Sequence, residues 1–157
     1  KLCVYAGPGG TILREHVEAL TEPVLEEDVF ALVDALMEGD AVRAVSLYRQ
    51  LLERKEEPIR IAALIASQLR IMLQVKELAA RSWPVRQIAA ELGLHPYRVR
   101  LAAEKARFWS EAHLAGRLRE IAELDYRMKT GQVDKAIGLE LYLLESGAMG
   151  RPAGTRI

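Results

Sequence analysis

Apolar residues recur at helical spacing through almost the whole chain, from Leu13 to Leu144, and this pattern constrains the fold more than any other feature. An amphipathic helix carries apolar residues three or four positions apart, whereas a half-buried strand alternates apolar and polar residues. No segment between turn signals shows a clean alternation of the second kind. The sequence therefore predicts an all-α fold, a bundle of about eight helices.

Helix start and stop signals divide the chain into segments. Pro23 disfavours the helical conformation in the residue before it, so we expect a first short helix, 13–20, to end before that proline. The other helices are expected near 26–38, after the capping residue Asp40, near 58–81, 84–92 and 95–108, from Ser110 to Gly131, and after Asp134. Residues 147–157 contain three glycines and no periodicity, which predicts a disordered tail.

The helix expected at 58–81 is apolar around much of its circumference, which indicates a central position covered on several sides. No run free of charged residues approaches the roughly 18 residues of a membrane span. Cys3 is the only cysteine, which fits a reducing compartment. We therefore expect a soluble, cytoplasmic protein.

The charge balance excludes a strong global attraction to nucleic acid or membranes, because 22 basic residues offset 22 acidic ones. One cysteine allows neither an internal disulfide nor the usual multi-cysteine zinc site. His16, His95 and His113 have no second ligand at metal-site spacing, so surface or capping roles are expected. The glycine-rich stretch 6–11 lacks the lysine that a phosphate-binding loop needs. We expect no metal, no cofactor and no catalytic residue.

Two short helices joined at Gly93 would also fit a DNA-reading helix-turn-helix over residues 84–107. In this interpretation the DNA contacts come from four cations: Arg98, Arg100, Lys105 and Arg107. The second helix lacks the Asn, Gln, Ser and Thr side chains that usually join arginine in reading base edges. The other interpretation is a packed hairpin inside a larger helical domain. Because the chain has no net charge, any affinity for DNA would have to come from a local basic patch.

Asp125 lies four residues before Lys129 and adjoins the apolar stripe of the helix that begins after Ser110. The pair can be an exposed ion pair worth roughly 0.3 to 0.5 kcal/mol. Alternatively, Asp125 is a partly buried carboxylate that holds a neighbouring helix by hydrogen bonds. Both interpretations make Asp125 and Lys129 structural rather than catalytic residues.

The order of several short motifs resembles one known family, the delta subunits of the bacterial DNA polymerase III clamp loader. The resembling pieces are Asp28–Leu36 followed by Gly39-Asp40, Glu57–Ile59, Gln68–Arg70, Ile88–Val99, Leu124–Gly131 and Leu139-Glu140. Each piece alone is unspecific, but together they span about 120 residues in the family's order. One departure is Leu13, which stands where the family usually has a threonine that can cap a helix.

The resemblance implies a division into the end of a small helical lid domain, 1–22, a carboxy-terminal helical collar domain, 23–146, and the tail, 147–157. In this family the delta subunit does not hydrolyse ATP; it is a subunit of the DNA-directed DNA polymerase holoenzyme that acts in DNA replication. It binds and opens the sliding clamp so that the ring can be placed around primed DNA. The family's clamp-binding element belongs to an amino-terminal region outside these 157 residues.

By the same resemblance the collar serves assembly, beside the ATPase subunits and the delta-prime subunit of the loader. Such a role requires apolar surface that only neighbouring subunits cover. The last helix has more apolar residues than one stripe can use, and Tyr142, Leu143 and Leu144 are the first candidates for that surface. Burial of these residues on both faces within the monomer is the alternative.

Overall fold

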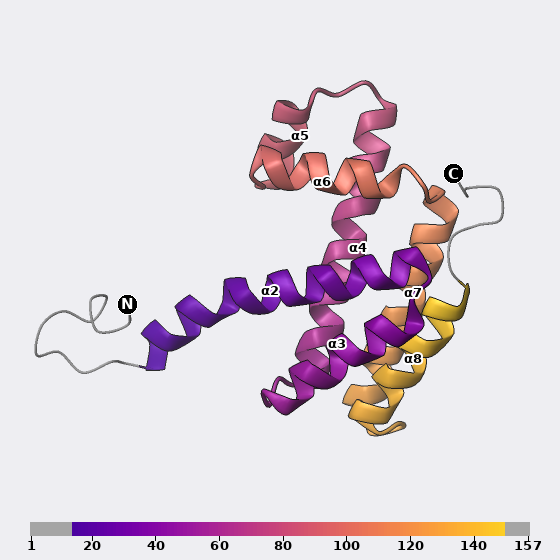
Figure 1. Cartoon of the computed structure of the whole chain (residues 1–157). Helices are drawn as coiled ribbons and strands as arrows, with labels where there is room; N and C mark the ends of the chain where they lie inside the picture. The colour runs from indigo at the N-terminus through magenta and orange to yellow at the C-terminus, as the bar shows by residue number, and fades with distance from the viewer. Residues whose placement is uncertain (1–13, 150–157) are drawn as a thin grey trace, which may run out of the picture.

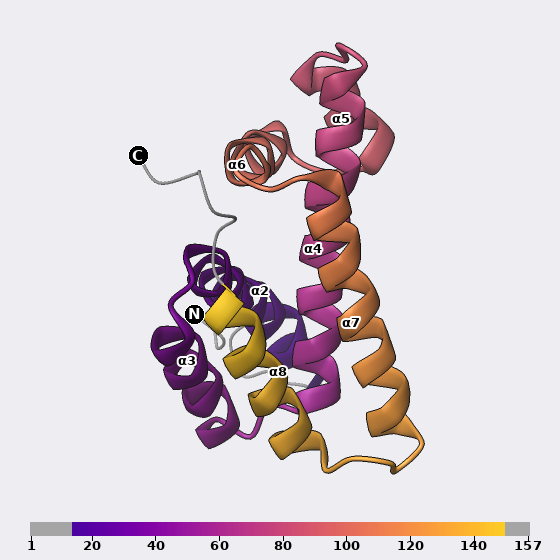
Figure 2. The same cartoon turned by 90° about the vertical axis from the view of Figure 1, so that its right-hand side faces the viewer.

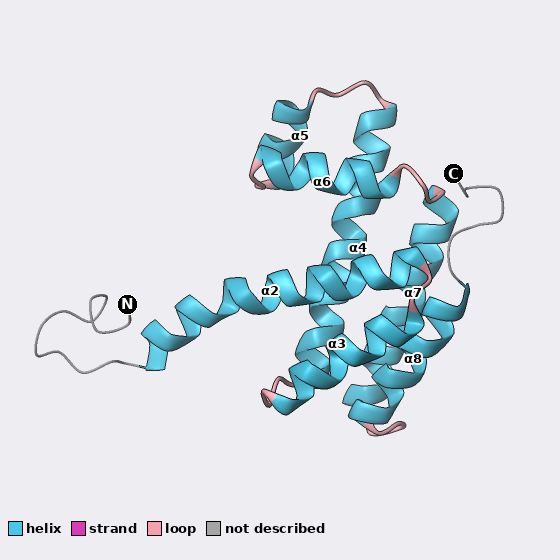
Figure 3. Cartoon of the chain, in the orientation of Figure 1, coloured by secondary structure: helices cyan, strands magenta, loops and turns pink. Residues whose placement is uncertain are grey.

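The computed structural model describes residues 14–149, and every regular element in that range is an α-helix. The seven helices are α2 (Arg14–Glu38), α3 (Ala41–Glu53), α4 (Pro58–Ala80), α5 (Val85–Leu92), α6 (Pro96–Ala106), α7 (Glu111–Lys129) and α8 (Lys135–Met149). Figure 1 shows them in chain order, and Figure 3 shows only short loops between them. The predicted all-α fold is confirmed, with seven described helices in place of about eight.

The helix boundaries follow the capping residues that the sequence contains. Asp40 accepts a hydrogen bond from the Arg43 backbone N–H at 3.0 Å and so begins α3. Ser110 does the same for the His113 N–H at 3.0 Å and begins α7. Gly39 ends α2 at φ 80°, a left-handed conformation that costs glycine little.

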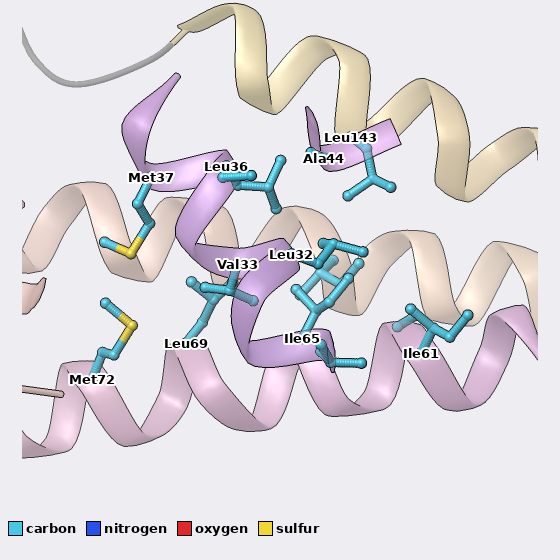
Figure 4. Packing of buried hydrophobic residues seen from close by; sticks show 14 of the residues in the cluster. Leu32, Val33, Leu36, Met37, Ala44, Ile61, Ile65, Leu69, Met72 and Leu143 are labelled. Atoms are coloured by element: carbon cyan, nitrogen blue, oxygen red, sulfur yellow. The ribbon is translucent and has the colours of Figure 1, made fainter. Parts of the chain in front are cut away.

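Helix α4 lies at the centre, in contact with α2, α5, α6, α7 and α8. Its apolar side chains meet those of α2 and α8 in one core, shown in Figure 4, where Ile61, Ile65 and Leu69 face Leu32 and Val33. By length and composition alone α4 could cross a membrane, but the core helix of a soluble protein passes the same test. The predicted central position of this helix is confirmed.

Figures 1 and 2 show two parts stacked along α4. Helices α2, α7 and α8 pack against its first half, with α3 outside them on α2 and α8, whereas the α5–α6 hairpin packs on its second half. Helix α8 lies at the surface between α3 and α7, as seen face-on in Figure 2. The arrangement leaves the outer face of α8 uncovered.

The predicted helix break before Pro23 is wrong, because α2 continues from Arg14 to Glu38 without interruption. A proline removes one backbone hydrogen bond and disfavours the helical conformation in its predecessor, but it does not always end a helix. The two helices expected at 13–20 and 26–38 are therefore one. The division of the chain at residue 22 into lid and collar stays a prediction, and no helix end marks it.

The predicted start of the tail at Gly147 is also wrong, since α8 runs to Met149. Gly147 is buried, and a Cβ there would lie 2.6 Å from both the Cα and the Cβ of Ala41. The glycine thus allows α8 to pack closely against the start of α3 and does not indicate a flexible tail. The remainder of the predicted tail, 150–157, lies outside the described residues, as do Cys3 and the stretch 6–11.

Candidate interaction surface on helix α8

Helix α8 has two apolar faces, and the fold uses only one of them. Leu139 and Leu143 are fully buried, whereas Ile137, Leu141 and Leu144 are 60%, 53% and 42% exposed. A turn of about 100° per residue places the exposed three, spaced at i, i+4 and i+7, on one side of the helix, opposite the buried residues. We call Ile137, Leu141 and Leu144 the α8 stripe.

Of the three residues predicted for a subunit interface, only Leu144 is exposed. Tyr142 is 8% exposed and Leu143 is 0% exposed, so the chain's own core covers both. The Tyr142 hydroxyl donates to the backbone oxygen of Arg117 at 3.3 Å, and burial raises the pKa of Tyr142 to about 12. Ile137 and Leu141 were not predicted for the interface. Their helical spacing from Leu144 is the sequence feature that could have indicated them.

Contacts along its inner side fix the orientation of α8. Tyr48, fully buried on α3, donates its hydroxyl hydrogen to the Ala136 carbonyl oxygen at 2.9 Å. The Glu140 carboxylate pairs with Arg49 of α3 at 2.8 Å. At its beginning, Asp134 accepts from the Ile137 N–H at 2.9 Å, as an N-cap does. These contacts hold the stripe facing outward.

A groove with a volume of about 320 Å³ separates the α8 stripe from α7. Leu124, Val133 and Leu141 contribute its apolar lining. A Cβ on Gly138 would lie 3.1 Å from Val133 Cγ2 and 3.4 Å from Leu124 Cδ1, so the backbone of α8 approaches these side chains closely. Three carboxylates, those of Glu120, Glu123 and Glu145, also line the groove.

Asp125 and Lys129 form the ion pair that their spacing allows, with Lys129 Nζ 2.8 Å from Asp125 Oδ2. The other carboxylate oxygen, Oδ1, is buried and has no hydrogen-bond partner in the described part of the chain. The hydrogen bonds to a neighbouring helix, which were the alternative, are therefore not formed by this oxygen.

The four cations proposed for DNA contact do not form one open patch. Arg98 Nη1 lies 3.8 Å from Glu26 Oε2, and Lys105 pairs with Asp34, both acids belonging to α2. Lys105 also lies over the Phe30 ring, with Nζ 3.6 Å from the centroid. Arg100 and Arg107 are exposed, on α6 and just after it.

The structure gives His95 the expected capping role, since its Nδ1 accepts from the Tyr97 N–H at 3.1 Å. His113 lies against Trp109 with ring centroids 3.9 Å apart, and its buried Nε2 has no hydrogen-bond partner among the described residues. The cavity beside it has a volume of about 20 Å³, enough for one water molecule rather than a ligand. Among the side chains that the structure describes, those of residues 24–147, no three His, Cys, Asp or Glu are grouped as a metal site.

The fold and the α8 stripe define the class: an all-helical domain with an exposed apolar face on its last described helix. Among solved structures, the chain is similar to the Bacillus subtilis DNA clamp loader delta protein (YqeN), with a TM-score of 0.76 and 38% identity, covering 93% of this chain and 43% of that one. The family model for the C-terminal domain of the DNA polymerase III delta subunit matches residues 26–146. The chain belongs to this delta-subunit family.

A curated relative supports the same assignment. The DNA polymerase III subunit delta of Bacillus subtilis (strain 168) is 39% identical over 145 residues, which are 92% of this chain. The chain spans 42% of the length of that relative. The resemblance recognised in the sequence motifs is confirmed.

Proposed function

We propose that this chain is the collar part of a clamp-loader delta subunit and joins its neighbours in the loader through the α8 stripe. The observation that carries the proposal is the outward-facing row of Ile137, Leu141 and Leu144 on a helix whose other face is already buried. A contiguous exposed apolar face of this kind is typical of association surfaces. Family membership says which kind of assembly the face would serve.

The partners of this face are the ATPase subunits and the delta-prime subunit of the same loader. In the complete delta subunit, other regions bind and open the sliding clamp, and primed DNA enters the assembled complex in the cytoplasm during replication. The collar adds no catalytic group of its own in this proposal. Its contribution is binding energy and the geometry of the assembly.

The test compares charge substitutions on the α8 stripe of the full-length delta subunit. Covering the exposed half of a leucine or isoleucine side chain stabilises a complex by about 1 kcal/mol, and burying an unpaired carboxylate in its place costs more. The double variant Ile137→Glu, Leu141→Glu should therefore bind the ATPase and delta-prime subunits at least about 100-fold more weakly. Tyr97→Glu, an exposed aromatic on α6 far from the stripe, is the matched control.

Binding is measured by light scattering on size-exclusion fractions over a concentration series. Far-UV circular dichroism of each variant checks that the fold is retained. Assembly by the double variant at wild-type concentrations would refute the proposed role of the stripe. Equal loss in the double variant and in Tyr97→Glu would show that any added surface charge has the same effect.

A further inference from the structure

The charged side chains that line the groove between α7 and α8 differ from one end of the groove to the other. Arg117 near the start of α7 donates from Nη1 to Ser146 Oγ near the end of α8 at 3.2 Å, so the two helices run antiparallel. Glu120 and Glu145 consequently lie at the same end of the groove. Arg127, the cation lining the groove, lies toward the opposite end, beside the loop that joins the helices.

Two of the three groove carboxylates lack a partner in the described part of the chain. Arg117 Nη1 lies 2.9 Å from Glu120 Oε2 and neutralises that carboxylate. Among residues 24–147, whose side chains the structure describes, neither Glu123 nor Glu145 has an ion-pair or side-chain hydrogen-bond partner. The exposed α8 stripe is thus bordered on its α7 side by two carboxylates that form no ion pair within the described residues, and Arg127 follows Glu123 four residues later on α7.

On the α3 side of the stripe the Glu140 carboxylate already has a partner, because it pairs with Arg49 of α3. The asymmetry matters for recognition, since complementary charges at the edge of an apolar contact select the partner and set its register. Phosphate groups would be repelled by Glu123 and Glu145, which argues against nucleic acid as the occupant. The geometry favours a protein segment that combines an apolar row with cations along one edge.

We propose that the α8 stripe and the adjoining groove receive an amphipathic helix of a neighbouring loader subunit, with lysine or arginine side chains that meet Glu123 and Glu145. This proposal rests on the proposed function and specifies the chemistry of the partner element. The apolar row of that helix covers Ile137, Leu141 and Leu144. Side chains of the partner helix enter the groove over Leu124, where Gly138 has no side chain to fill the space.

The experiment reverses the two unpaired charges in the full-length delta subunit with Glu123→Lys and Glu145→Lys. At low salt the double variant should bind the ATPase and delta-prime subunits roughly tenfold more weakly, and the deficit should shrink at about 0.5 M NaCl because salt screens exposed charges. The control is Glu91→Lys with Glu104→Lys, two exposed acids on α5 and α6. That pair should leave assembly unchanged.

A photo-reactive amino acid in place of Leu144 identifies the partner segment directly. Cross-linking to a helical peptide that carries lysine or arginine beside its apolar residues is the expected result. Cross-linking to an acidic segment, or to a second copy of the delta subunit, would overturn the proposal.

The two proposals fail in different ways. If the stripe variant Leu141→Glu weakens assembly but the Glu123, Glu145 reversal behaves like its control at every salt concentration, the basic-helix proposal is wrong and the assembly role stands. If neither change weakens assembly, the α8 face is not the contact and both proposals are wrong.

Discussion

Removal of the Tyr48 hydroxyl group tests how α8 is held in place. Tyr48 is fully buried, and its hydroxyl donates to the Ala136 carbonyl oxygen at 2.9 Å, at the beginning of α8. Tyr48→Phe keeps the ring and deletes this hydrogen bond. Because a typical buried hydrogen bond contributes about 1 kcal/mol, the free energy of unfolding should fall by about that amount at pH 7.

The same hydroxyl makes the difference between wild type and variant depend on pH. Burial, with smaller contributions from the charges of Glu140 and Asp134, raises the pKa of Tyr48 from 10.0 to about 12. A group whose pKa is higher in the folded state contributes stability that is complete below the unfolded pKa. That contribution is lost as the pH rises toward the folded pKa. By pH 11 the wild type should have lost on the order of 1 kcal/mol from this residue, and the variant none.

We therefore expect Tyr48→Phe to be less stable than wild type at pH 7 and equal or slightly more stable at pH 11. Urea unfolding of this chain, followed by far-UV circular dichroism at both pH values, measures the two differences. Tyr142 also has a raised pKa, but it is present in both proteins and cancels. Tyr126→Phe, at a site 63% exposed, should change nothing at either pH. A difference that stays constant from pH 7 to pH 11 would refute the reasoning.

Two further substitutions test close packing and a second titrating group. Gly147→Ala would place a Cβ 2.6 Å from the Ala41 Cα, so α3 and α8 must separate; we expect a loss of about 1 to 3 kcal/mol, measured by thermal unfolding, with partial recovery when Ala41→Gly is added. An unchanged melting temperature would contradict this. Burial, followed by the nearby Arg117 charge, lowers the pKa of His113 below 6.5, against a smaller opposing effect of Glu120. Stability should therefore decrease as the pH falls below about 6.5, and His113→Phe should make the profile between pH 7.5 and pH 5 shallower; equal slopes would contradict it.

The parts of the fold that the sequence predicted well are those decided by near neighbours in the chain. Asp40 and Ser110 begin helices through hydrogen bonds to residues three positions later, and Gly39 ends one through its own backbone conformation. Both partners of such a capping interaction lie within a few residues of each other, so the local sequence alone is enough to predict it. The helix after Asp40 and the helix after Ser110 consequently lie where they were expected.

Two of the errors have distant causes. Gly147 lies in a glycine-rich stretch of the kind that predicts a tail. Its role nevertheless depends on Ala41, more than 100 positions earlier in the chain. The ion pair of Lys105 with Asp34 joins residues 71 positions apart and takes a cation from the predicted DNA-contact set. No local pattern contains these partners.

The candidate surface shows a third kind of limit, because α8 is apolar on two faces and periodicity alone does not tell which one turns inward. Leu139 and Leu143 form one row, and Ile137, Leu141 and Leu144 form the other; both rows have helical spacing. The choice depends on Tyr48 and Arg49 of α3, which hold α8 in one rotation.

This rotation also gives the strongest physical reason to expect a partner. Scattered exposed apolar residues are ordinary on protein surfaces, but three on one face of one helix form a continuous patch. None of the three belongs to the buried core, so polar residues at these positions would leave that core intact and would lower the tendency to aggregate. The folding of this domain therefore does not require apolar residues there, whereas the docking of another helix does.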